Sequence, residues 1–438
     1  MKGLLDKLAK LFIENIWLKI SFFNSFSVLA RVISGWVINK VIAIYIGPEG
    51  TSISEQFRNF LQTAQGFATL GISEGVTRYS AKYQNNKKQL SSFLASAYKI
   101  VLITSIILSV LIIAFSGFIN RQLFGERDFS LLIILTGIMI PVFSINIILM
   151  AVLNGFQKYK KITYITIVSN ITSALIALYL IYNYHLYGAV LLVIISQIIS
   201  FIATLFFVKS DMIEVLQFSL GLSKNSHYKR LFGYVIMALV TAVTIPLFSI
   251  LIRNQIFDYY PHDKGIHAGY WDGVKKISGL FLSFVTPIFS LYYYPQLAKI
   301  HTNLEFQVEL KKFYKQIFPI FVVGMLLLYL LRHWATIIFF SSAYTPMENL
   351  FGWQFAGDLL RIMSLTIAFL MLARAHVLYY VTTEILFWVV FYVLTYFLLP
   401  EYDLEGVVIA YFFSYVFYFL AMLILYRKYI FSSKIVKL

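Results

Sequence analysis

Residues 31–78 read RVISGWVINKVIAIYIGPEGTSISEQFRNFLQTAQGFATLGISEGVTR, two apolar helices joined by a short Gly-Pro turn. Each helix is long enough to cross a bilayer, which requires about 20 mainly apolar residues. Five ionisable residues lie inside these helices or at their edges: Arg31, Lys40, Arg58, Glu74 and Arg78. Because a charged side chain inside a membrane is costly, such residues are functional candidates by default.

The composition extends this character to the whole chain. The 438 residues are 60% hydrophobic and 13% charged, with a mean hydropathy of +0.78. These values predict a polytopic membrane protein, so the net charge of +16 is interpreted loop by loop and not as a sign of nucleic-acid binding. The absence of cysteine excludes disulfides, thiolate catalysis and cysteine lipidation.

Apolar runs between polar breaks predict twelve membrane spans, all of them α-helical. Each run is about twice as long as a barrel strand and shows no alternation of period two. The fold class is therefore an all-α polytopic membrane protein, in which twelve spans suggest two six-span halves. The spans lie near residues 20–45, 56–78, 92–117, 129–153, 162–182, 187–208, 231–252, 268–295, 313–340, 350–373, 375–398 and 405–426.

The distribution of Lys and Arg between the loops predicts the orientation. One set of alternate loops, together with both termini, holds 23 basic residues, and the other set holds five. The five are Arg121, Arg127, Arg253, Lys264 and Arg332. Since basic loops stay in the cytoplasm, both termini are expected there. An even number of spans per half favours a parallel repeat, with an N-terminal lobe at 1–210, a linker at 211–228 and a C-terminal lobe at 229–438.

Several kinds of chemistry have no motif in the sequence. No GxxxxGK[ST] loop is present, so no ATPase is expected, and the seven His residues show no metal-ligand spacing. We therefore expect no metal, no cofactor and no enzymatic activity. The outward loops, near 253–270 and 333–349, are too short for the catalytic domain of a membrane glycosyltransferase or polymerase.

Charged residues within the spans indicate what the interior binds. Six basic candidates outnumber three acidic ones, and surplus positive charge attracts an anion, most simply a phosphate or diphosphate. The basic set is Arg31, Lys40, Arg58, Lys275, Lys276 and Arg361, and the acidic set is Glu74, Asp358 and Glu384. The acidic residues are candidates for coupling transport to an ion.

Structural explanations compete with this hypothesis. Long basic side chains near a helix end can extend to the headgroups, which accounts easily for Arg78 but poorly for Arg31, about 16 Å from the start of its span. Asp358 and Arg361, three residues apart on one helical face, would suit a structural ion pair. Glu74 and Arg78 allow the same interpretation.

Three blocks of sequence resemble a known family. They are NKVIAIYIGPEG with EQFRNF, AGYWDGVKKIS with LYYYPQLAK, and WQFAGDLLRIMSLTIAFLMLARA. They are similar to the lipid-linked oligosaccharide flippases, namely the O-antigen and enterobacterial-common-antigen translocases of the multidrug/oligosaccharidyl-lipid/polysaccharide exporter superfamily. The matching family positions are Asn39, Lys40, Gly47, Pro48, Gly50, Gln56, Asn59, Gly269, Tyr270, Trp271, Gly357 and Asp358.

The resemblance implies two six-helix bundles around a central cavity. It also implies alternating access and movement of an undecaprenyl-diphosphate-linked oligosaccharide from the cytoplasmic to the periplasmic leaflet of the bacterial inner membrane. It also implies membrane lipid, a proton or sodium ion, and polysaccharide polymerase and chain-length proteins as candidate partners. Glu74 departs from the small or amide residue expected at its position. The alternatives are a cation-coupled small-molecule exporter, which would favour an acidic cavity, and a membrane glycosyltransferase or polymerase.

Overall fold

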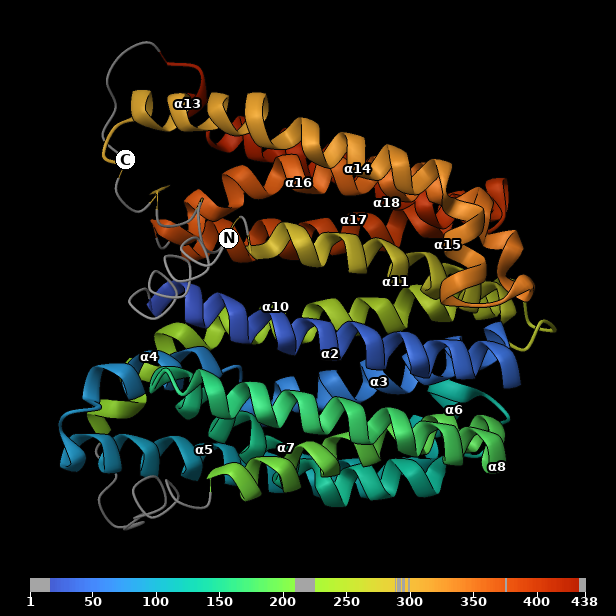
Figure 1. The fold of residues 1–438 in the computed structure, drawn as a ribbon, viewed down its shortest axis with the longest axis horizontal. Helices are drawn as coiled ribbons and strands as arrows, with labels where there is room; N and C mark the ends of the chain where they lie inside the picture. Colours follow the sequence, from blue (N-terminus) through green and yellow to red (C-terminus); the bar gives the residue numbers. More distant parts are fainter. Residues whose placement is uncertain are drawn as a thin grey trace, which may run out of the picture. The chain divides into compact units, whose positions relative to one another are not determined.

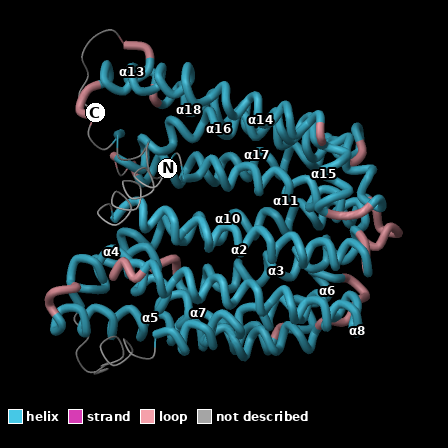
Figure 2. Tube along the Cα trace, in the orientation of Figure 1, coloured by secondary structure: helices cyan, strands magenta, loops and turns pink. Residues whose placement is uncertain are grey.

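The structure is a computed structural model that describes residues 16–208, 225–287, 289, 293, 296–297, 300–374 and 376–432. The described chain is helical and contains no extended strand (Figure 2). The helices up to residue 208 are α2 (Ile16–Tyr45), α3 (Pro48–Thr69), α4 (Ser73–Tyr83), α5 (Lys87–Ala114), α6 (Ser116–Phe124), α7 (Ser130–Gly155) and α8 (Tyr159–Val208).

The second set of helices begins after residue 224. Between α13 and α14 lies a π-helical turn, Phe313–Ile317, and a 3-10 helix, Ser342–Leu350, precedes α16. The α-helices are α10 (Asn225–Tyr259), α11 (Ile266–Pro287), α13 (Asn303–Lys312), α14 (Phe318–Leu330), α15 (Arg332–Phe339), α16 (Phe351–Ala373), α17 (Val377–Tyr402), α18 (Glu405–Leu425) and α19 (Arg427–Ile430) (Figure 1).

These helices confirm the prediction of an all-α polytopic membrane protein. Eight of the described helices are long and apolar enough to cross a membrane. One of the eight is α8, whose 50 residues contain two spans because His185, with φ 46°, breaks the helical path. The more polar helices α3, α10 and α11 occupy the three remaining predicted spans.

The predicted span at 56–78 is wrong in its bounds, because two helices occupy this region. Leu70 and Gly71 have positive φ values of 49° and 62°, a backbone conformation that ends α3 before α4 begins. Glu74 and Arg78 therefore belong to α4 and not to the helix that carries Arg58.

The chain divides into two compact units. The first comprises the described residues of Met1–Val41 and Leu61–Val243, and the second those of Ile42–Phe60 and Thr244–Leu438. In the first unit α7 packs against α4, α5 and α8, and in the second α18 packs against α16 and α17. Residues 211–224 of the predicted linker 211–228 lie outside the described part of the chain. The predicted division into lobes at 1–210 and 229–438 therefore stays a prediction.

Candidate functional site

Helix α3 is the most polar of the long helices in the first half of the chain. Its apolar residues Ile53, Phe57 and Leu61 are buried and recur every four residues, so they form one face of the helix. Glu55 and Arg58, on another face, keep partly exposed side chains. A helix of this composition is not among those apolar enough to cross a membrane by itself, so it needs a polar environment or protein around it.

Glycines bring α3 close to α11 in the second unit. Gly47 adopts φ +84° in the turn before Pro48, a conformation that side-chain-bearing residues rarely adopt. At Gly269 on α11, a Cβ atom would lie only 2.0 Å from the carbonyl oxygen of Pro48. The hydroxyl of Thr51 also contacts the hydroxyl of Tyr344, further along the same unit. These contacts fix the first turns of α3 against α11, which carries Asp272, Lys275 and Lys276.

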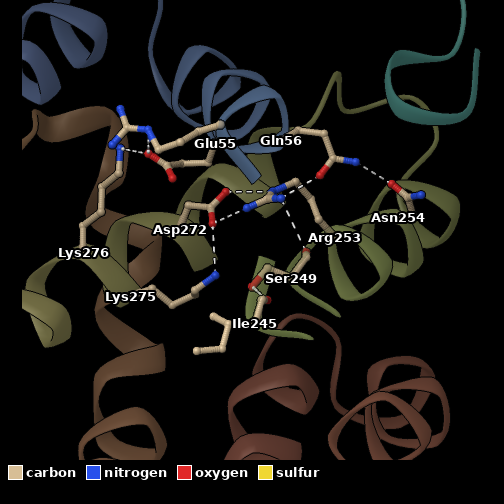
Figure 3. Close-up of polar contacts among 10 residues, drawn as sticks. Glu55, Gln56, Ile245, Ser249, Arg253, Asn254, Asp272, Lys275 and Lys276 are labelled. Atoms are coloured by element: carbon tan, nitrogen blue, oxygen red, sulfur yellow. Dashed lines mark hydrogen bonds and ion pairs between the residues drawn. The ribbon is translucent and has the colours of Figure 1, made fainter. Parts of the chain in front are cut away.

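A buried ion pair lies at the centre of this region. Figure 3 shows the guanidinium of Arg253, from α10, between Asp272 and Gln56. Its Nη2 and Nε donate to the two oxygens of Asp272 at 2.7 and 3.0 Å, and its Nη1 donates to Gln56 Oε1 at 2.6 Å. Gln56 Nε2 in turn donates to Asn254 Oδ1 at 2.7 Å. The two charges therefore satisfy each other with a bidentate geometry and almost no exposure to solvent.

Three further basic side chains surround this pair. Lys275 Nζ lies 3.6 Å from Asp272 Oδ1 and 3.8 Å from the centre of the Trp271 ring, a cation–π arrangement. Lys276 Nζ lies 3.1 Å from Glu55 Oε1 (Figure 3). Arg58 Nε lies 3.6 Å from the same oxygen. The exposed fraction is 33% for the Lys275 side chain and 43% for that of Arg58.

The charges of this group do not balance. We call it the cationic cluster and define it as Glu55, Arg58, Arg253, Asp272, Lys275 and Lys276. Four basic and two acidic side chains leave a net charge of +2. Arg253 is fully buried by its pair with Asp272, whereas Arg58 and Lys275 remain accessible. A ligand with two adjacent negative charges would complete the cluster.

The structure places Arg361 and Asp358 apart from the cationic cluster, in a second polar group. Asp358 is fully buried on α16 and accepts hydrogen bonds from Ser278 Oγ at 2.6 Å, Tyr411 OH at 2.8 Å and Gln354 Nε2 at 3.4 Å. Its hydrogen-bond partners are therefore neutral side chains from α11, α16 and α18. Arg361, partly buried, lies within electrostatic range of Tyr411, Tyr415 and Asp358.

Among the described residues, the expected ion pair between Asp358 and Arg361 is not formed within 4.0 Å, so that prediction is wrong. The physical reason is that three neutral donors already surround the carboxylate. Glu384, on α17, accepts a hydrogen bond from Trp388 Nε1 at 3.3 Å.

The remaining candidates belong to the first unit. Arg31 is exposed and Lys40 is half-buried on α2, and Asn39 precedes Lys40 on that helix. Glu74 lies in the first turn of α4, and its side chain is outside the described part of the chain. No contact described here tests a ligand-binding role for these residues, so their roles stay predictions.

Most family-motif residues hold the helices or the cluster in place. Gln56 and Trp271 contact Arg253, and Tyr270 packs edge-on against Tyr344. Asn59 is buried on α3. A Cβ at Gly50 would lie 2.7 Å from Ile46 Cβ, and one at Gly357 would lie 2.6 Å from the Tyr411 ring. These positions explain why the motifs need glycine there.

The sequence interpretation missed three members of the cationic cluster. Arg253 was expected in an outward loop, which is wrong, because α10 continues to Tyr259 and buries the residue completely. The predicted span 231–252 stops before Arg253 because an unpaired charge is unfavourable in a membrane. In the structure, Asp272 neutralises the charge of Arg253. Glu55 and Asp272 each lie three residues before a basic residue of the cluster, a helical spacing that could have indicated them.

Solved structures share this fold. An inward-facing multidrug resistance MATE family transporter of the MOP superfamily superposes with a TM-score of 0.71 at 13% identity, covering 93% of this chain and all of the other. The lipid II flippase MurJ in an inward closed conformation gives 0.69 at 16% identity, covering 94% and 87% of the two chains. The fold therefore defines the class as a multi-pass membrane protein with the architecture of MOP superfamily transporters.

Sequence relatives narrow the class. A lipid III flippase of Escherichia coli (strain K12) is 28% identical over 403 residues, which cover 92% of this chain and 96% of the relative. A putative O-antigen transporter of Shigella flexneri is 23% identical over 67% of this chain and 72% of its own. Residues 18–301 match the model of the polysaccharide biosynthesis protein family. The chain belongs to that family.

Proposed function

We propose that this protein is a flippase that moves an undecaprenyl-diphosphate-linked oligosaccharide from the cytoplasmic to the periplasmic leaflet of the bacterial inner membrane, for assembly of a cell-surface polysaccharide. The observation that carries the proposal is the cationic cluster, with its net charge of +2 and its accessible Arg58 and Lys275. The names of the relatives, a lipid III flippase and a putative O-antigen transporter, agree with this substrate class.

The chemistry of the cluster suits a diphosphate headgroup. A guanidinium such as that of Arg58 can donate to two phosphate oxygens at once, and the ammonium of Lys275 supplies compact charge. The buried pair of Arg253 and Asp272 holds α10 and α11 in register, so the ligand does not have to organise the site. The prenyl chain can stay in lipid while the polar head follows the polar helices, and alternating access would expose the head to each side in turn.

Transport needs an energy source, and the sequence has no ATP-binding motif. A proton or sodium gradient, the membrane potential or the substrate gradient therefore drives the step in this proposal. Asp358, Glu384 and Glu74 remain the coupling candidates. Polysaccharide polymerase and chain-length proteins would act on the exported lipid-linked sugar, which makes them the expected partners. A drug exporter of the same superfamily is disfavoured, because the cluster described here is basic.

Orientation is tested with reporter fusions. Periplasm-active reporters placed after residues 50, 125, 260 and 402 are expected to be active, and those after 86, 160, 222 and 438 inactive. Active reporters at both 222 and 438 would overturn the orientation.

The function is tested by depleting the protein and locating the lipid-linked sugar. We expect the sugar to accumulate on the cytoplasmic leaflet and to return to the periplasmic leaflet when the wild-type chain is restored. Arg31→Ala at normal protein level should restore almost no export, whereas Arg31→Lys should restore part of it. An unchanged leaflet distribution after depletion would refute the flippase function. Wild-type export by a well-expressed Arg31→Ala would refute the proposal that Arg31 binds the diphosphate.

A further inference from the structure

The partly exposed face of α3 changes from charged to amide side chains along the helix. Glu55, Arg58, Gln62 and Gln65 follow one another at intervals of three, four and three residues, so they lie on one face. Gln62 is exposed and Gln65 half-buried. At 1.5 Å per residue, Gln65 lies about 10 Å along the helix from Arg58.

The exposed side chain of Gln62, in the interior of a long helix, requires an explanation. Gln62 lies well inside a helix of 22 residues, far from the Pro48 end. Polar side chains within a membrane face protein or a water-filled cavity, because the hydrocarbon offers no hydrogen-bond partner. Phe57, Leu61 and Ala64, on a different face of the helix, are buried. The amide face of α3 therefore lines a polar path.

A third amide joins this face from another helix of the first unit. Gln65 Nε2 donates to Gln197 Oε1, on the second half of α8, over a long distance of 3.5 Å. This bond uses one of the two donors of Gln65 and one acceptor position of Gln197. Within the described part of the chain, the other amide groups of these two half-buried side chains are left for a ligand.

Three neutral amides favour one kind of ligand chemistry. Hard cations prefer sets of carboxylate oxygens, and phosphates prefer Arg and Lys. Amides both donate and accept hydrogen bonds without net charge, which suits the hydroxyl and acetamido groups of a sugar. A sugar attached to a diphosphate would continue from the charged half of the α3 face onto its amide half.

From this placement we infer that Gln62, Gln65 and Gln197 form a sugar-binding subsite, which contacts the first carbohydrate residues next to the diphosphate. The inference rests on the proposed function, and it assigns a different part of the substrate to each half of α3. The charged half binds the diphosphate of any prenyl lipid, and the amide half distinguishes a sugar-bearing lipid from a bare one.

The test compares two probes on purified full-length protein in nanodiscs. One probe is a short-chain prenyl diphosphate, and the other is the same lipid carrying one N-acetylhexosamine. Gln62→Leu and Gln65→Leu should each weaken binding of the sugar-bearing probe by about two- to tenfold and leave the bare probe unchanged. Lys275→Gln should weaken both probes equally. Gln122→Leu, on the exposed surface of α6, is the matched control and should change neither.

Each outcome decides between the hypotheses. If both probes bind Gln62→Leu and Gln65→Leu as tightly as the wild type, or lose affinity equally, the sugar subsite is refuted and the flippase function stands. If neither probe binds the wild type, the proposed function itself fails. Leucine at position 65 cannot form the hydrogen bond between α3 and α8, so Gln65→Asn serves as a second variant. It should show the same selective loss with an unchanged unfolding temperature.

Discussion

Asp272 and Asp358 are two buried carboxylates of the second unit that are stabilised in different ways. Asp272 is neutralised by the guanidinium of Arg253, and Lys275 lies at its edge. Asp358 is held by the hydroxyls of Ser278 and Tyr411 and by the amide of Gln354. The first arrangement organises surplus positive charge around it, whereas the second keeps a single acidic group among neutral donors. In the proposed function, this difference separates the expected diphosphate site from the expected coupling residue.

Removing Arg253 should have the largest effect. Arg253→Leu leaves Asp272 buried without its partner, and breaking a buried pair in this way costs about 3 to 5 kcal/mol. We expect little folded protein in the membrane, measured by quantitative blotting and by thermal unfolding in detergent. The double variant Arg253→Met with Asp272→Leu should recover much of the loss. A normal level of the single variant would show that the pair does not stabilise the fold.

Removing Lys275 should affect binding and leave the fold intact. Its side chain is one-third exposed, so Lys275→Gln removes a charge of the proposed diphosphate site without leaving a buried group unpaired. A hydrogen bond to a charged group contributes about 1.5 to 3 kcal/mol, which corresponds to roughly a 10- to 150-fold loss of affinity for a prenyl diphosphate. Isothermal titration on purified protein measures this loss. Wild-type affinity would exclude Lys275 from the anion site.

Substituting Asp358 should cost less stability than substituting Asp272. In Asp358→Asn, the remaining carbonyl oxygen still accepts from Ser278 or Tyr411, so we expect a loss of about 1 to 2 kcal/mol. Asp272→Asn should cost more, because Arg253 loses its counter-charge. Unfolding midpoints of the two variants give the comparison. Equal losses of stability in the two variants would mean that the neutral donors stabilise the Asp358 carboxylate as much as Arg253 stabilises that of Asp272.

The variant Asp358→Asn also tests whether transport is coupled to an ion. Asp358→Asn and, separately, Glu384→Gln should slow lipid-linked sugar export without removing the protein from the membrane. Export is followed in vesicles over a range of pH values, with Gln122→Leu as the control. If both acidic-residue variants export at the wild-type rate throughout, proton coupling through Asp358 or Glu384 is wrong.

The smallest effect is expected at Gly279, beside Ser278 on α11. A Cβ atom there would meet nothing within 4 Å, so Gly279→Ala should stabilise the helix by about 0.5 to 1 kcal/mol. Export should be unchanged, because Gly279 lies beyond the segment of α11 from Asp272 to Ser278 that joins the two carboxylate sites. A stabilised variant with slow export would instead show that α11 must bend at this glycine.

Hydropathy and charge in the sequence were sufficient to predict the membrane class and the approximate positions of the helices. The ends of α16 and α18 lie within a residue or two of the predicted spans 350–373 and 405–426. The wrong bounds of the predicted span 56–78 have a local cause. The break at Leu70 and Gly71 depends on backbone conformation, and hydropathy averaged over a window does not resolve a single αL residue.

Hydropathy and charge along the chain indicate that it crosses the membrane many times as helices and that basic residues exceed acidic ones within the predicted spans. Which of these charges neutralise one another depends on how the helices pack. Arg253 contacts Asp272, 19 residues away, and Gln56, 197 residues away. Such pairings arise because burial removes water as a hydrogen-bond partner, so each buried charge must find its partner in whichever helix packs beside it. Hydropathy and spacing along one helix contain no information about that neighbour.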